Sequence, residues 1–184
     1  MSVDFAGLNQ PVPPTGAELR VVDADGSGLE TIAEASAFAG PPAWSPDGTQ
    51  LAFSGGSETV STIDVVSAGG GEVSTIVEIE DAMLGEPAWD ADGGRIAFVI
   101  SSAAIFSATG AIGMVSSDGG DVTRLAELED AYFASPIWSP NGEWLAAVRA
   151  SGMALSADLI VIDPATGEET ILATGAMRAL SWRE

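Results

Sequence analysis

Histidine, cysteine and lysine are all absent from this chain of 184 residues, and all six of its basic residues are arginine. Without histidine or cysteine there is no Ser–His or Cys–His nucleophile, no imidazole or thiolate metal site and no disulfide. The side chain that ordinarily changes its charge near neutral pH is missing too. These absences exclude much familiar catalytic and metal chemistry and leave carboxylates as the main reactive groups.

Positive charge is scarce, because six basic residues stand against 27 acidic ones and the net charge is −21. Such a surface repels phosphate backbones and anionic lipids, so we expect no nucleic-acid partner and no membrane partner. Hydrophobic residues nevertheless make up 46% of the chain, too many for a disordered acidic tail. The acidity fits either adaptation to high salt or the solubility of an apolar-rich chain.

The N-terminus has neither a basic segment nor an apolar run, so we expect no signal peptide. Residues 96–117 carry no charge and are long enough to cross a bilayer as a helix. The stretch is interrupted by serine, threonine and glycine, which suits two apolar strands joined by a loop better than a membrane helix. We therefore expect two strands here.

Three segments share one design: residues 41–55 (PPAWSPDGTQLAFSG), 86–100 (EPAWDADGGRIAFVI) and 135–149 (SPIWSPNGEWLAAVR). Each holds a short run ending in tryptophan, then Asp-Gly or Asn-Gly, then an apolar run. Trp44, Trp89 and Trp138 are 45 and 49 residues apart, and a fourth copy begins at Trp182. Asp, Asn and Gly tolerate positive φ, so each pair predicts a tight hairpin turn. We expect the three tryptophans to be equivalent core residues between repeats.

Two more β-rich runs follow each hairpin. The runs at 18–24, 61–67, 110–116 and 159–163 predict a third strand, and those at 31–32, 75–76, 124–125 and 171–172 a fourth. A four-stranded unit repeating every 44 to 49 residues is typical of a β-propeller. We therefore expect an all-β fold, with residues 1–184 forming one domain of four blades, each of four antiparallel strands.

The repeat is offset, because the chain begins with a second strand at residues 3–5 and ends with a first strand at residues 180–182. We expect residues 179–184 to complete the first blade with residues 2–33. A four-bladed monomer and an eight-bladed homodimer both give every blade four strands with this offset. Of the two we favour the homodimer, in which the last strand of one chain completes the first blade of the other.

The motif PxWSPDGxxLAF, at Pro42, residues 44–48 and residues 51–53, resembles the WD-like repeat of the TolB-like β-propeller family. That family includes the propeller domains of prolyl oligopeptidases and dipeptidyl peptidases. Weaker copies lie at 87–98 and 136–147, so the resemblance covers essentially the whole chain. It implies a propeller and a periplasmic or extracellular location. The family commonly closes with six to eight blades, and its peptidases carry their nucleophile in a separate domain that nothing here matches.

The segment DADGSGLETIAE at residues 23–34 matches a calcium-loop pattern. Its oxygen ligands would be Asp23, Asp25, Ser27 and Glu34. Position eight, normally apolar, is Glu30, and no helices flank the loop. In the register of the repeat this segment is the turn between the third and fourth strands, and we favour that hairpin over the calcium site. No other cofactor is indicated.

Acidic and bulky residues recur where the fourth strand of one blade leads to the first strand of the next. These connections share one end of the propeller with loops of variable length, where binding surfaces are usually built. Carboxylates beside aromatics suit a cationic or peptide ligand, although the same side chains would also serve to plug the channel. The predicted ligand-binding residues are Phe38, Asp81, Met83, Leu84, Asp130, Tyr132 and Phe133.

These features favour a non-catalytic scaffold that binds a protein or peptide partner, either as half of an eight-bladed homodimeric ring or as part of a larger exported protein. They assign no catalytic residue. The alternative is a carboxylate-based enzyme or a calcium-dependent binding module.

Overall fold

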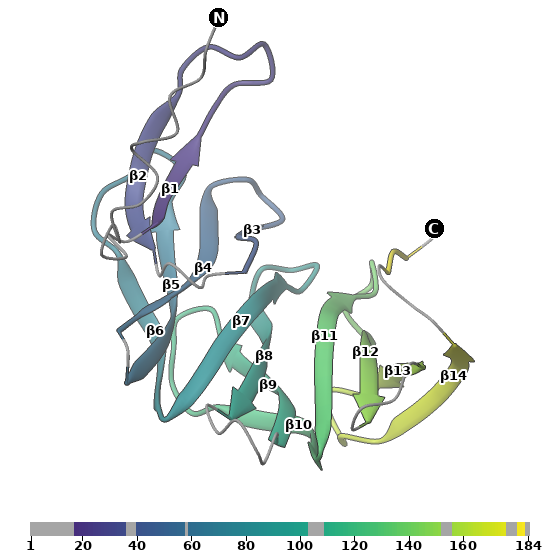
Figure 1. Ribbon diagram of the computed structural model, residues 1–184. Helices are drawn as coiled ribbons and strands as arrows, with labels where there is room; N and C mark the ends of the chain where they lie inside the picture. Colours follow the sequence, from purple (N-terminus) through teal and green to yellow (C-terminus); the bar gives the residue numbers. More distant parts are fainter. Residues whose placement is uncertain are drawn as a thin grey trace, which may run out of the picture.

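The computed structural model describes residues 17–35, 40–57, 59–102, 109–151, 156–175 and 180–182. Within these ranges all regular structure is β, and it comprises fourteen strands. The strands form four antiparallel sheets that stand side by side along an open arc, with the first and last sheets at its two ends (Figure 1). The predicted all-β class is confirmed, and each sheet is a blade.

In each blade the strands follow one another in chain order, each paired with the next. Blade 1 has β1 (Ala17–Val21) and β2 (Glu30–Ala35). Blade 2 has β3 (Ala43–Trp44), β4 (Gln50–Gly56), β5 (Val60–Ser67) and β6 (Ser74–Glu80). Blade 3 has β7 (Ala82–Trp89), β8 (Arg95–Ser102), β9 (Thr109–Ser116) and β10 (Thr123–Glu129). Blade 4 has β11 (Ala131–Trp138), β12 (Leu145–Ser151), β13 (Ala157–Ile162) and β14 (Glu169–Gly175). The prediction of four-stranded blades is confirmed for blades 2, 3 and 4.

The predicted completion of blade 1 concerns the two ends of the chain. Residues 3–5 lie outside the described residues. Residues 180–182 follow blade 4 and are not assigned to a strand. That these two segments pair therefore stays a prediction.

The uncharged stretch at 96–117 forms two strands, as expected. β8 and β9 pair antiparallel from Arg95 opposite Ser116 to Ser101 opposite Gly110. In the part of the chain that the structure describes, no helix is long and apolar enough to span a membrane.

The hydrophobic core lies in three layers, one between each pair of neighbouring blades, and each layer draws side chains from both. Representative pairs are Leu19 with Phe53, Ile63 with Phe98, and Ile112 with Leu145. A middle blade thus buries both of its faces, which is why its central strands are apolar on both sides. Burying one such side chain fully contributes roughly 1.5–3 kcal/mol, so the layers between blades hold the arc together.

Three tryptophans of the repeat make the same hydrogen bond to the blade before them. Trp89 and Trp138 end the first, or inner, strands of blades 3 and 4, and Trp182 follows blade 4. The indole Nε1 donates to the carbonyl of the residue just before the corresponding tryptophan of the preceding blade. The bonds are Trp89 to Ala43 (3.1 Å), Trp138 to Ala88 (3.0 Å) and Trp182 to Ile137 (3.0 Å). Trp138 is 6% exposed, and the inter-blade position predicted for Trp89 and Trp138 is confirmed.

Trp44 departs from this pattern, because 49% of its surface is exposed. The prediction that it is a core residue is wrong. Among the described residues, the preceding blade consists of β1 and β2 and offers no inner strand on which this indole could pack. The difference therefore comes from the neighbouring blade and not from the repeat itself.

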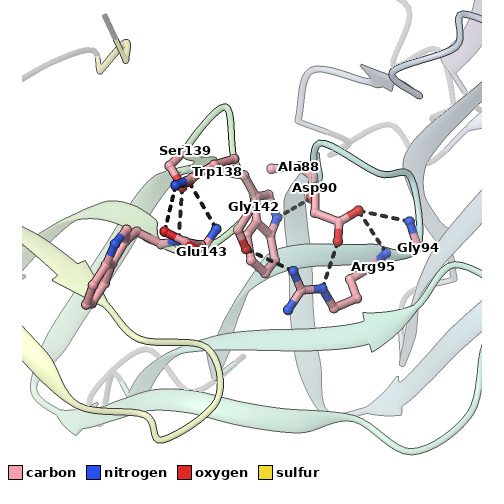
Figure 2. A network of polar contacts seen from close by, with 10 residues as sticks. Ala88, Asp90, Gly94, Arg95, Trp138, Ser139, Gly142 and Glu143 are labelled. Atoms are coloured by element: carbon pink, nitrogen blue, oxygen red, sulfur yellow. Dashed lines mark hydrogen bonds and ion pairs between the residues drawn. The ribbon is translucent and has the colours of Figure 1, made fainter. Parts of the chain in front are cut away.

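Blades 3 and 4 are also joined by a polar network at the turns that follow their tryptophans (Figure 2). The guanidinium carbon of Arg95 lies 4.5 Å from the ring centroid of Trp138. Arg95 Nε donates to the buried Asp90 carboxylate at 2.7 Å, and its Nη2 donates to the Gly142 carbonyl at 3.0 Å. Asp90 also accepts from the backbone N–H groups of Gly94 and Arg95. The buried carboxylate is thereby fully partnered, as burial requires.

The turn that joins β3 to β4 is wider than the sequence predicted. The Ser45 N–H donates to the Gln50 carbonyl and the Gly48 N–H to the Ser45 carbonyl, both at 2.9 Å. Of the Asp47-Gly48 pair, only Gly48 has a positive φ, 70°. The predicted tight turn is therefore wrong for this pair, because Pro46 and Asp47 can occupy the central positions of an ordinary type I turn, which needs positive φ at neither residue.

Candidate functional site

Single-residue turns at Asp81 and Asp130 connect the outer strand of one blade to the inner strand of the next. Both aspartates have a φ of 53°, in the left-handed region that aspartate tolerates better than most residues. The Asp81 N–H donates to the carbonyl of Thr59, which lies between β4 and β5, at 3.1 Å. The connection from one blade to the next at Asp81 and the connection between β4 and β5 therefore lie at the same end of the blade, as predicted.

The bulky residues after these turns lie in strands and not in loops, which corrects the prediction. Met83 and Leu84 pair with Ser101 and Ile100 of β8. Tyr132 and Phe133 are in the equivalent positions of β11, paired with β12. Only one residue separates the last strand of a blade from the first strand of the next blade, so β7 and β11 begin directly after Asp81 and Asp130.

The strand period divides these residues into two kinds. Met83 and Tyr132 are 51% and 54% exposed, whereas Leu84 and Phe133 are 5% and 4% exposed and belong to the core layers. Successive side chains of a strand point to opposite faces, so one residue of each pair packs and the other is free to contact a ligand. Together with Asp81 and Asp130, which are also exposed, Met83 and Tyr132 make up what we term the inner-strand surface.

Two further residues at these strands were not predicted from the sequence. Glu86 and Ser135 have φ values of 51° and 52° and lie where the register of β7 and β11 shifts. The Glu86 carboxylate accepts a hydrogen bond from the Ser135 N–H and so links blades 3 and 4. Proline follows each residue, and a proline within a strand run is the signal that could have indicated a bulge.

Backbone strain concentrates at these inner strands. In the described ranges, the non-glycine residues with positive φ are Asp81, Glu86, Asp130 and Ser135. Such conformations cost of order 1–3 kcal/mol each and tend to cluster at functional sites. The strain supports the inner-strand surface as the candidate site, although the bulges also re-aim the strand for packing.

The four predicted calcium ligands are not brought together. Asp23, Asp25 and Ser27 form the turn between β1 and β2, whereas Glu34 lies along β2 opposite Glu18. The Ser27 backbone N–H and hydroxyl donate to one Asp25 oxygen at 2.9 and 2.6 Å, and these bonds lower the pKa of Asp25. The structure thus has the hairpin that the repeat register favoured.

Within the described ranges, no three acidic side chains are arranged to hold a metal ion. Phe38, also predicted for ligand binding, lies outside the described residues. The candidate site therefore comprises Asp81, Met83, Asp130 and Tyr132, supported by the bulges at Glu86 and Ser135.

The sequence profile of the TolB beta propeller domain matches residues 14–181. No curated protein is significantly similar to the chain. Among solved structures, TolB of Agrobacterium tumefaciens superposes with a TM-score of 0.69 at 19% identity, covering 93% of this chain and 63% of that one. An oligogalacturonate lyase of Vibrio parahaemolyticus gives 0.60 at 17% identity, covering 85% of this chain and 48% of that one. Dipeptidyl peptidase 4 of Porphyromonas gingivalis gives 0.60 at 14% identity, with 82% and 27% covered.

At these identities the structural likeness shows the fold alone. The chain also spans 63% or less of the length of each of these three proteins. The profile, in contrast, matches nearly the whole sequence, including the three tryptophan-centred repeats. This chain belongs to the TolB beta propeller domain family.

Proposed function

We propose that this domain is a non-catalytic scaffold that binds an extended, cationic peptide segment of a partner protein on the inner-strand surface. The observation that supports it best is the repeated exposure of Met83 and Tyr132, each two residues after an exposed aspartate in the left-handed conformation. Two equivalent positions on neighbouring blades each place a large exposed side chain beside an exposed aspartate, which suits a ligand with repeating side chains.

The chemistry of the surface matches a basic peptide. The face of Tyr132 attracts an arginine or lysine cation, and Met83 adapts its flexible side chain to varied apolar stems. Asp81 and Asp130 add negative charge beside them, on a chain whose net charge is already −21. A cationic partner is drawn to such a surface over long range and at a rate that falls with salt.

Several features favour binding over catalysis. The chain has no histidine, cysteine or lysine, so an enzyme would depend on carboxylates. The lyase and peptidase activities of the structural relatives belong to those proteins, which are longer than this chain.

The proposal is tested by titrating the domain with a basic peptide of alternating arginine and valine and measuring heat of binding. Tyr132→Ala and Met83→Ala should each weaken binding about tenfold, the effect of losing one anchoring contact of about 1.4 kcal/mol. Trp144→Ala is the matched control, since Trp144 is 43% exposed at the opposite end of its blade. No binding by the unaltered domain, or equal weakening by the control, would contradict the proposal.

The two-chain ring that the repeat count favours is a separate part of the proposal. It concerns the two ends of the arc and not the inner-strand surface, so peptide binding and assembly can be tested independently.

A further inference from the structure

The last, or outer, strands of blades 1, 2 and 3 are β2, β6 and β10. Each is covered by the blade that follows it, through a contact that is repeated at all three interfaces. The residue at the bulge of the outer strand is aliphatic, and a glycine in the turn of the next blade lies against that residue. The glycine faces backbone and side-chain atoms of Ile32 and Ile76 and the backbone carbonyl of Leu125. The pairs are Ile32 with Gly70, Ile76 with Gly119, and Leu125 with Gly167. The three aliphatic residues are 8%, 8% and 6% exposed. A methyl group built on Gly70 would lie 3.7 Å from Ile32 Cβ, and on Gly119 3.7 Å from Ile76 Cβ.

The same two groups occur at the ends of the arc, and there they are uncovered. Leu172 occupies the bulge of β14, between Ile171 and Ala173 in the register, yet it is 59% exposed. Gly26 occupies the turn of blade 1, with the same hydrogen bond to Asp23 that Gly70 makes to Ser67, and nothing lies within 4 Å of a methyl group built on it. One end therefore presents the aliphatic half of the contact and the other end the glycine half.

The inner strands show a second complementary pair. Trp182 already donates to the Ile137 carbonyl, so residues 180–182 lie beside blade 4 where the inner strand of a following blade belongs. The pattern of the other tryptophans then assigns the next acceptor to the Ser181 carbonyl. Trp44, 49% exposed, is the indole that would reach it.

We propose that the two ends join between two copies of this chain. Blade 1 of one copy docks on blade 4 of the other, so that Gly26 covers the partner copy's Leu172 and Trp44 donates to its Ser181 carbonyl. The contact continues the interface that already joins blades 1 to 2, 2 to 3 and 3 to 4. A second copy fits better than the chain's own first blade, because blades 1 and 4 stand at opposite ends of an open arc (Figure 1). Two reciprocal junctions related by a twofold axis close a ring of eight blades. This inference rests on the two-chain part of the proposed function, for which it names the contacting residues, and it does not depend on peptide binding.

The test is the mass of the full chain by light scattering in about 0.15 M salt, where charges are screened beyond about 8 Å. The unaltered chain should give twice its 18.6 kDa mass, and Leu172→Asp should give the single mass. Ile171→Asp is the matched control: Ile171 is 54% exposed on the same strand, but its equivalents Thr31, Thr75 and Arg124 stay exposed where the next blade is present. This variant should remain dimeric. Trp44→Phe, which removes the indole donor, should weaken the dimer about tenfold.

Thermal melting of Leu172→Asp should stay cooperative, which separates loss of assembly from loss of fold. Three results would overturn the proposal. The unaltered chain could remain at the single mass at hundreds of micromolar, the two aspartate variants could behave alike, or Trp44 could be protected from solvent in a single-mass chain. The last would mean that the chain closes on itself as four blades.

Discussion

Trp44 and Trp138 occupy the same place in the repeat, yet one is 49% exposed and the other 6%. Trp138 packs under Arg95 and donates to the blade before it, whereas the structure gives Trp44 no inner strand of a preceding blade within the described residues. The comparison shows that a side chain at a given position of the repeat is buried only where a complete neighbouring blade packs against it. Blade 2, which carries Trp44, adjoins blade 1, and the described part of blade 1 consists of β1 and β2 alone, so the interface between these two blades lacks the inner strand that covers Trp138 elsewhere.

The strongest test of the comparison is to remove each indole in turn. Trp138→Ala should lower the free energy of unfolding by about 3–5 kcal/mol, as expected for a buried large aromatic. Trp44→Ala should lower it by less than about 1 kcal/mol when the chain is dilute enough to be monomeric, since half of that side chain is already in water. Urea denaturation measures both, and equal losses would show that the two positions are equivalent after all.

Leu125 and Leu172 allow the same comparison on the outer strands, because they occupy equivalent positions of which one is buried and the other exposed. Leu125→Ala empties a covered position and should cost about 3 kcal/mol, within the usual range for a buried leucine. Leu172→Ala, at the equivalent but exposed position, should change the stability of the dilute chain by about 0.5 kcal/mol or less. A large loss at Leu172 in a chain of single mass would mean that something within the same chain covers β14.

The polar network at the middle of the arc gives a smaller effect. Arg95→Gln copies the residue that blade 2 has at this position, Gln50, and leaves the buried Asp90 without its cation. We expect a loss of about 1–3 kcal/mol, because the carboxylate keeps only its backbone donors. Arg20→Gln is the control, since its ion pair with Glu18 is exposed and should contribute about 0–1 kcal/mol. If both variants lose a similar free energy of unfolding, the network around Asp90 stabilises the fold no more than an exposed ion pair does.

Acidification should show the smallest effect, at the end of the arc. Hydrogen bonds from Thr174 and Arg149 lower the pKa of Asp158 below its ordinary value. A lowered folded-state pKa stabilises the fold above the unfolded-state pKa, and this stabilisation is lost as the pH falls through the folded-state value. The urea midpoint should therefore fall between pH 5 and pH 3, and less steeply for Asp158→Asn. Identical slopes for the two proteins would contradict the role of Asp158.

The sequence was most informative about what every repeat has in common. The spacing of Trp44, Trp89 and Trp138 predicted the blades, and the β-branched runs predicted their third and fourth strands, because these patterns reflect packing that each blade shares. The exposure of Trp44 and Leu172 could not be predicted in this way. Both residues carry the pattern of a buried position. Leu172 is uncovered because no blade follows blade 4 among the described residues, and Trp44 because the described part of blade 1 has no inner strand.

The candidate site was predicted in part. The acidic and bulky residues near Asp81 and Asp130 were identified, but they were placed in loops because nothing in the sequence shows that one residue suffices to connect two blades. Without strand assignments, the alternation that exposes Tyr132 and buries Phe133 could not be assigned to faces. The bulges at Glu86 and Ser135 depend on a positive φ at each residue, and the proline that follows each residue is the one signal of a bulge in the sequence.

The account is tested most directly by following the five tryptophans separately, as ¹⁹F resonances of 5-fluorotryptophan assigned through Trp→Phe variants. In the dilute chain the Trp44 resonance should shift between light and heavy water, and it should lose that shift as the concentration rises and a second copy covers it. The Trp138 resonance should be insensitive to solvent at every concentration. A Trp44 resonance that behaves like that of Trp138 at all concentrations would contradict both the open end of the arc and its closure by a second copy.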